Sequence, residues 1–412
     1  MIELLSLFTL VFAVIIGFWK NINVGLVAIV FAFLFGHYVG GIPVNTIIGY
    51  WPLRLFFTTF GVTLLFSIAK LNGTLEKLSR MIIYQSHGKK ALIPILFYFL
   101  ALILASIGPG NISTSALLLP IGLVIAYRTN ISILMMSGLI ILGSIAGGLS
   151  PIAPNGIVAL ELASTHGVGD LGFGIYINNV IVMTVFSGLI YIALGGLKMN
   201  GVRVEIEKPE PFTKIQIVTL ISIVLLVVWV IIGGVNVGIA AFVLAAVLFL
   251  FKAADETQAI LGVPWSTLLL ICGTAVLVSV IDTLGGVELL TSFLANLMTP
   301  RTAMPILGVL SGVMSIFSSA VGVVMPTLIP TAVNLSNELG GTSSPALITA
   351  TIAVGSHITT TSPFSTMGAL ALATAPENVD RKKLFKQLFI LSFVASLFFA
   401  VISFLGLFGF FL

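Results

Sequence analysis

The hydrophobic positions of this chain form long apolar stretches that occur in the same order in two halves. In the first half, membrane helices are predicted at about 2–19, 23–40 and 52–69. A charged stretch at 70–90 follows, with apolar residues at helical spacing, which predicts a helix lying in the membrane interface. A re-entrant hairpin at about 91–127, a broken helix at about 131–162 and a last helix at about 173–196 complete this half.

The second half repeats this order after a polar linker. Helices are predicted at about 214–232, 236–252 and 265–283, and an arm at about 286–300. A second hairpin (about 302–335), a second broken helix (about 345–374) and a final helix (about 384–411) follow. We therefore predict an all-α polytopic membrane protein with a first repeat (1–196), a cytoplasmic linker (197–213) and a second repeat (214–412).

Two stretches with interrupted hydrophobicity carry the repeat most clearly. GSIAGGLSPIAPNGIVAL (143–160) and GSHITTTSPFSTMGALAL (355–372) are identical at seven positions when aligned at an offset of 212. Each lies within an apolar span and is rich in Gly, Pro, Ser and Thr. Paired interrupted segments of this kind are the best sequence pointer to a transporter's binding site.

The hairpins are predicted from interruptions in their middles. Ser106–Ser115 contains Pro109 and two glycines and is not expected to form regular helix, and each flank is short for a full crossing. Backbone that is irregular at membrane depth must be buried in protein or line a cavity. The second hairpin is expected to have its tip at 317–322.

Composition and charge fix the class and the orientation. Hydrophobic residues make up 58% of the chain and charged residues only 8%, which is far from the composition of a soluble domain. With the N-terminus outside, sixteen of the eighteen Lys and Arg residues fall on the cytoplasmic side. Five crossings per half make the second repeat inverted, and both termini are expected to be extracytoplasmic in a bacterial-type inner membrane. The net charge of +4 is no nucleic-acid signature, because the basic residues lie between spans.

The predicted site is almost uncharged and suits a small anion together with a cation. Half-helix N-termini attract carboxylates, and free carbonyls with Asn, Ser or Thr oxygens suit Na⁺. The expected substrate contacts are Asn111, Ser113, Ser150, Pro151, Ser318, Ser319, Thr360, Thr361, Ser362 and Pro363. The expected cation contacts are Gly108, Asn111, Gly147, Asn155, Ser319 and Thr359.

An alternative reading places these small polar residues at helix contacts, where Gly, Ser and Thr allow close packing. His357 lies within the second broken helix, where it could pack, form hydrogen bonds or serve a substrate or proton role. No catalytic motif or Cys/His cluster is present in the sequence, so neither an enzyme nor a cofactor is expected.

The motifs resemble those of the divalent-anion:sodium symporters, a family of the ion-transporter superfamily. GNISTSALLLP (110–120) resembles the SNTATAAMMLP-type hairpin motif, with Asn111 on that motif's Asn, and GSIAGGLSPIAPN (143–155) is similar to the family's broken-helix pattern. GPGN and SPFSTMGALALA are closer to the malonate-carrier-like branch. The chain departs from the pattern at Gly110 and Ile112, at Val321 in place of a second Asn, and at Thr359–Thr361 in place of glycines.

The resemblance implies a homodimeric elevator transporter in the lipid bilayer that carries di- or tricarboxylates, usually with Na⁺. The sequence leaves two alternatives open. One is a proton-coupled carrier or inorganic-ion antiporter on the same fold. The other is a membrane subunit that transports nothing.

Overall fold

The computed structural model describes residues 1–412 except 21, 85–86, 170 and 200–207, so the middle of the predicted linker at 197–213 lies outside the described residues. All regular elements of the described chain are helices. Those of the first half are α1 (Ile2–Lys20), α2 (Val24–Phe33), the π-helix η1 (Leu34–Val39), α3 (Val44–Gly49), α4 (Leu53–Leu71), α5 (Thr74–Tyr84), α6 (Leu92–Ser106), α7 (Gly110–Arg128), α8 (Ile133–Gly148), α9 (Pro154–Thr165), α10 (Gly174–Ala193) and the 3₁₀ turn η2 (Gly196–Met199).

The second half contains the same series. Its elements are α11 (Lys214–Ile231), α12 (Val237–Leu250), α13 (Glu256–Leu261), α14 (Trp265–Thr283), α15 (Gly286–Leu297), α16 (Ala303–Phe317), a continuous helical segment made of η3 (Ala320–Val324), α17 (Met325–Leu328), η4 (Ile329–Thr331) and α18 (Ala332–Glu338), then α19 (Pro345–Ile358), α20 (Thr366–Thr374) and α21 (Arg381–Phe404).

The two halves keep the same spacing along the chain. Six pairs of helices begin 212 residues apart, at residues 2 and 214, 44 and 256, 53 and 265, 74 and 286, 133 and 345, and 154 and 366. Capping follows the same spacing: the Ser132 side chain accepts from Met135 N at the start of α8, and Ser344 accepts from Leu347 N at the start of α19. The internal repeat found in the sequence is therefore also a repeat of structure.

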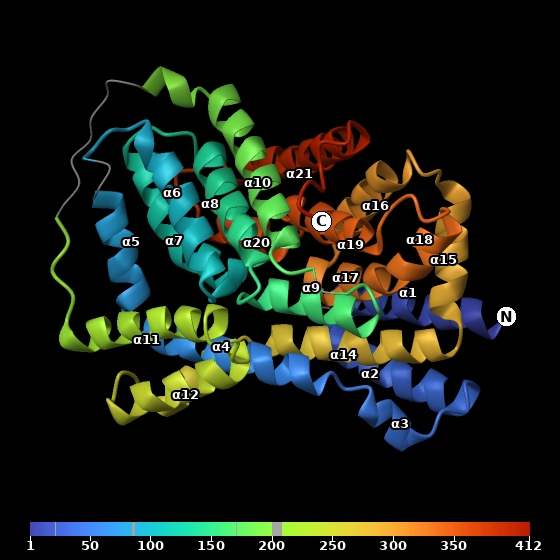
Figure 1. Ribbon diagram of the computed structural model, residues 1–412. Helices are drawn as coiled ribbons and strands as arrows, with labels where there is room; N and C mark the ends of the chain where they lie inside the picture. Colours follow the sequence, from blue (N-terminus) through green and yellow to red (C-terminus); the bar gives the residue numbers. More distant parts are fainter. Residues whose placement is uncertain (21, 85–86, 170, 200–207) are drawn as a thin grey trace.

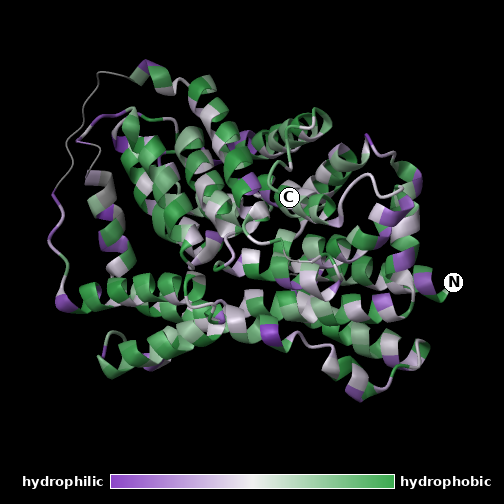
Figure 2. Cartoon of the chain, viewed as in Figure 1, coloured by the Kyte–Doolittle hydropathy of each residue, from purple (hydrophilic) through white to green (hydrophobic). Residues whose placement is uncertain are grey.

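Within the described residues, six helices are long and apolar enough to cross a bilayer, which makes the chain a multi-pass membrane protein: Val44–Leu71, Gly110–Arg128, Gly174–Ala193, Trp265–Thr283, Ala320–Glu338 and Arg381–Phe404. Figure 2 shows hydrophobic residues along most helices, with hydrophilic residues gathered at helix ends and in connecting segments.

The expectation of an irregular Ser106–Ser115 was too broad. Only residues 107–109 lie between α6 and α7, and Asn111 to Ser115 form the first turns of α7. The reason is that Pro109 precedes the helix as its N-cap with a φ of −65°, where its missing N–H costs nothing. The return arms of both hairpins are consequently 19 residues long. The short helices α3 and α13 were not predicted, because six residues are too few to show a period.

The helices form two layers. Figure 1 shows α4, α11, α12 and α14 in a base layer along the bottom of the view, with α6, α7, α8 and α10 above it. In the base layer α4 packs against α12, and α14 against α2. In the upper layer α6 and α7 pack on α8, and α16 packs on α19 and α21. Each first hairpin arm thus packs on the broken helix of its own half.

Identical glycines of the repeat allow this close packing. A Cβ atom on Gly143 would lie 2.4 Å from the Tyr98 carbonyl oxygen of α6, and one on Gly355 would lie 2.6 Å from Ser311 Oγ of α16. These contacts leave no room for a larger side chain, so both glycines are required by helix packing.

Candidate functional site

A pocket lies where the interruptions of both halves meet. The space between its walls is about 450 Å³ when the open solvent at its mouth is included. Its lining residues come from both hairpins, both broken helices and α14: Asn111, Ile112, Asn155, Thr267, Ser318, Ser319, Ala320, Val321, His357, Thr360, Ser365, Thr366 and Met367. None of the lysines, arginines, aspartates or glutamates in the described part of the chain lines it.

Four helix N-termini converge on this pocket. Each of four helices begins beside it and contributes lining residues from its cap or first turn: α7, α9, the segment 320–338, and α20. The partial positive charge at a helix N-terminus favours anions, and its free N–H groups can donate to them. In the second half, Ser319 and Ser365 already cap their helices, whereas no side chain caps α7 or α9.

Two asparagines of the first half lie side by side in the pocket. A Cβ atom built on Gly148 would lie 3.3 Å from Asn111 Cβ and 3.7 Å from Asn155 Nδ2, so both side chains cover the same glycine. Asn111 Oδ1 accepts from Ile112 N at 2.9 Å. Asn155 Nδ2 is 3.0 Å from His357 Nε2 of α19. Both amides are buried.

Six of the predicted site residues line the pocket, and the others lie elsewhere. Asn111, Asn155, Ser318, Ser319, Thr360 and His357 are in the lining. Ser113, Ser150, Pro151, Thr361, Ser362, Pro363, Gly108, Gly147 and Thr359 are not.

The Thr359–Ser365 run mostly satisfies the protein's own backbone. Thr359 Oγ1 donates to the Gly312 carbonyl at 3.0 Å, and Ser362 Oγ donates to the Ile316 carbonyl at 3.1 Å. These bonds attach the second broken helix to α16. Thr360 Oγ1 donates to the His357 carbonyl at 2.7 Å. The fully buried hydroxyl of Thr361 has no hydrogen-bond partner among the described residues.

The two glycines predicted as cation contacts also lie where helices pack closely. A Cβ atom on Gly147 would lie 2.2 Å from the Leu102 carbonyl oxygen of α6. Gly108 has a φ of +139° and would place a Cβ 2.0 Å from the Phe66 ring of α4, so only glycine fits at this tip. Gly322 of the second tip packs in the same way on Leu270 of α14. Both hairpin tips therefore rest on apolar side chains of the base layer.

Thr267 is a lining residue that the sequence did not reveal. It lies in the first turn of α14, a helix that Gly and Pro do not interrupt as they interrupt the broken helices. Only the placement of the second hairpin over α14 brings it to the pocket. Ile112, Ala320 and Met367 give the lining an apolar part, and no sequence signal distinguishes them from ordinary core residues.

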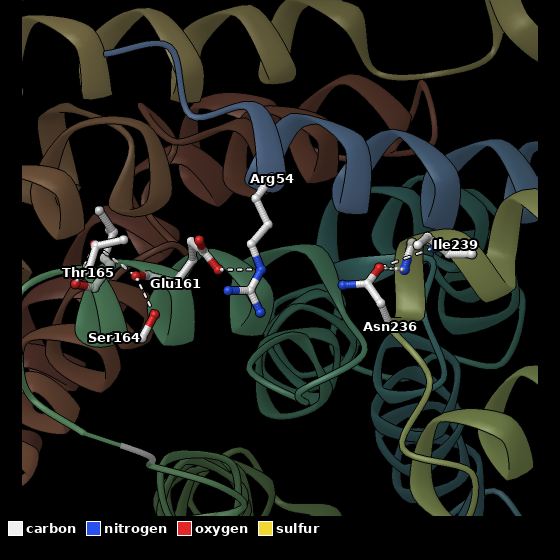
Figure 3. Close-up of polar contacts among 8 residues, drawn as sticks. Arg54, Glu161, Ser164, Thr165, Asn236 and Ile239 are labelled. Atoms are coloured by element: carbon white, nitrogen blue, oxygen red, sulfur yellow. Dashed lines mark hydrogen bonds and ion pairs between the residues drawn. The ribbon is translucent and has the colours of Figure 1, made fainter. Parts of the chain in front are cut away.

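An ion pair joins the two layers outside the pocket. Arg54 Nε of α4 is 3.5 Å from Glu161 Oε2 of α9, with side-chain exposures of 72% and 21%. Figure 3 shows the guanidinium reaching from α4 toward the α9 carboxylate. Ser164 and Thr165 donate to the Glu161 carbonyl, which holds the last turn of α9.

The comparisons agree with the family resemblance over the N-terminal third. Residues 1–148 match the family described as "Dicarboxylate carrier protein MatC N-terminus". No curated protein is found to match the sequence. Among solved structures, the YdaH transporter of Alcanivorax borkumensis, reported to have an unusual topology, is similar with a TM-score of 0.61 and 15% identity, covering 88% of this chain and 87% of that chain. The first third of this chain is thus similar to dicarboxylate carriers, and nearly the whole chain has the fold of the YdaH transporter.

Proposed function

We propose that this protein is a secondary transporter of a small di- or tricarboxylate, coupled to Na⁺. The observation that carries the proposal is the convergence of four helix N-termini on one uncharged pocket. Helix dipoles and N–H groups can hold carboxylates without a lysine or arginine. The similarity of residues 1–148 to dicarboxylate carriers supports the same substrate class.

Na⁺ coupling follows from the charge balance of the pocket. A dianion in a pocket without a basic side chain gains from a co-bound cation, because charges at membrane depth are costly. Asparagine and backbone oxygens are ligands that Na⁺ accepts, and Asn155 lines the pocket beside the break between α8 and α9. Proton coupling through His357 is less well supported, since both ring nitrogens already have partners.

An elevator-type movement is consistent with the contacts between the layers. The tips of both hairpins contact the base layer through glycines, which pack on the apolar side chains of Phe66 and Leu270. Such surfaces can slide without breaking hydrogen bonds. We propose that the base layer is the scaffold and that the upper layer moves as a unit in each protomer of a homodimer.

The test uses purified protein and proteoliposomes. We expect Na⁺ and a dicarboxylate such as malonate or succinate to raise the melting temperature, and each to strengthen the effect of the other. Uptake should require a Na⁺ gradient and should not be replaced by a proton gradient. A melting temperature unchanged by both ligands, together with no Na⁺-dependent flux for any di- or tricarboxylate, contradicts the proposal.

The Arg54–Glu161 pair gives a test of the movement. We expect Arg54→Gln to increase hydrogen–deuterium exchange in α9, because the variant loses a link that favours the observed state. An exposed ion pair contributes at most about 1 kcal/mol, so the conformational ratio should change by up to about fivefold. Arg54→Glu combined with Glu161→Arg should restore the exchange rate. Arg301→Gln, at an exposed arginine of the second half, is the control. Unchanged exchange in α9 would show that the pair does not hold the layers.

A further inference from the structure

A buried hydrogen bond joins the two halves of the protein at the pocket. His357 lies in the last turn of α19, and Asn155 lies in the first turn of α9, 202 residues away. Their Nε2 and Nδ2 atoms are 3.0 Å apart. His357 has no exposed surface and Asn155 has 6%. The bond is therefore an internal feature of the pocket wall.

The partners of His357 determine its protonation. Nδ1 is 2.7 Å from the Ala353 carbonyl oxygen, which can only accept, so Nδ1 carries a hydrogen. No carboxylate pairs with His357 among the described residues. A buried imidazolium without a counter-ion would be costly, so the ring is neutral and Nε2 presents a lone pair. That lone pair accepts a hydrogen bond from the Asn155 amide nitrogen.

This bond determines which end of the Asn155 amide faces the pocket. The NH₂ group is directed to the histidine, so the Oδ1 atom is the end that remains. No hydrogen bond to Oδ1 is found among the described residues, and this atom is not among the buried atoms that lack a partner. Asn155 lines the pocket beside Asn111. The free Oδ1 atom can therefore coordinate a cation that enters the pocket.

The arrangement exists in one half only. At the offset of 212, Ile145 corresponds to His357 and Met367 corresponds to Asn155. The equivalent positions in the other half are therefore both occupied by apolar side chains. Packing at the equivalent position is achieved without a histidine–asparagine pair, which makes this pair a candidate for a role in ligand binding.

We propose that His357 is a positioning residue for cation binding. It holds the Asn155 amide so that Oδ1 faces the pocket and contributes an oxygen to Na⁺. The inference rests on the proposed Na⁺ coupling and adds a residue that acts across the repeat boundary. His357 itself neither contacts the cation nor transfers a proton.

Substitutions that keep or remove the acceptor test this role. His357→Gln places an amide oxygen near the position of Nε2 and should keep the apparent Na⁺ affinity within about threefold of the native value. His357→Leu removes the acceptor and should weaken Na⁺ binding about tenfold, which is the effect of roughly one hydrogen bond. The His357→Asn side chain can keep the bond to Ala353 but is too short to reach Asn155. This variant should therefore have the same Na⁺ affinity as His357→Leu, and it replaces His357→Leu in the test if the leucine variant folds poorly.

The readouts are Na⁺-dependent melting temperature and Na⁺-dependent uptake, measured on monodisperse protein. Asn155→Ala should weaken Na⁺ binding at least as much as His357→Leu, and the double variant should be no weaker than Asn155→Ala alone, because residues that act through one another are not additive. Native affinity in His357→Leu and His357→Asn, or additive losses in the double variant, would overturn the positioning role. Loss of uptake in His357→Gln together with a changed pH profile would overturn it in favour of a proton role. A native protein that does not respond to Na⁺ would instead overturn the proposed coupling, and this inference with it.

Discussion

Replacement of Gly156 with alanine is expected to reduce transport to about a tenth or less and to lower the melting temperature. A Cβ atom at this position would lie 1.9 Å from the Ser150 carbonyl oxygen. The backbone of the break, and not a flexible side chain, would have to move. Overpacking that forces the backbone to shift typically costs about 1–3 kcal/mol. The displacement would also move Asn155, the preceding residue, which lines the pocket.

The second half offers the same test independently. A Cβ atom on Gly368 would lie 2.0 Å from the Ser362 carbonyl oxygen, so Gly368→Ala should cause a similar loss. Gly188→Ala is the matched control, because it lies in α10 with no atom within 4 Å of the added Cβ. Fluorescence-detected size exclusion, melting temperature and initial uptake rate would be measured for all three variants. Near-native uptake in Gly156→Ala would show that the close approach of the Ser150 carbonyl oxygen to Gly156 is not needed for transport.

These glycines show what the sequence could and could not predict. Gly156 and Gly368 were found as identical positions in the two interrupted stretches, and the repeat follows from such identities. The reason why glycine is needed at both positions is that a backbone carbonyl oxygen lies against it. This contact depends on the course of the backbone between the two half-helices, which the sequence does not show. The long helices were predicted to within a few residues, because an apolar stretch in a bilayer must satisfy its backbone internally as helix.

The pocket lining was predicted only in part, because the composition of a stretch does not show which of its side chains point into the pocket. The Thr359–Ser365 run and the tip residues look equally polar in the sequence, yet Thr359 and Ser362 donate to α16 while Ser319 lines the pocket. Thr267 could not be predicted, because it reaches the pocket from a helix with no interruption. Polar residues at a helix break therefore indicate where the pocket lies. They do not show which side chains face a ligand and which form hydrogen bonds with the protein's own backbone.

Replacement of Asn111 with alanine is expected to raise the substrate concentration for half-maximal uptake about tenfold to a hundredfold. As oriented in the structure, Asn111 Oδ1 accepts only from Ile112 N, and no partner of its Nδ2 is found among the described residues. The free NH₂ group lies in the first turn of α7, where it can donate to a carboxylate beside an uncapped helix N-terminus. Hydrogen bonds to charged groups contribute about 1.5–3 kcal/mol, which corresponds to this range.

The variant should remain folded, because the Asn111 side chain makes its one resolved hydrogen bond to the neighbouring residue of its own helix. Melting temperature without ligand should therefore be close to native, while stabilisation by dicarboxylate should be largely lost. Asn334→Ala, at an exposed asparagine of the second hairpin, is the control. An Asn111→Ala protein that takes up dicarboxylates with native affinity would contradict the substrate contact assigned to Asn111.

The position equivalent to Asn111 in the second hairpin makes the result informative about the whole pocket. Val321 occupies it and lines the pocket with an apolar side chain, so no second amide can replace a lost Asn111. If Asn111 recognises a carboxylate, a single substitution should abolish most of the recognition, whereas a symmetric pocket would retain about half of its contacts. A loss of about tenfold or more in Asn111→Ala, with Val321→Ala near native, would therefore indicate that ligand recognition is concentrated in the first repeat.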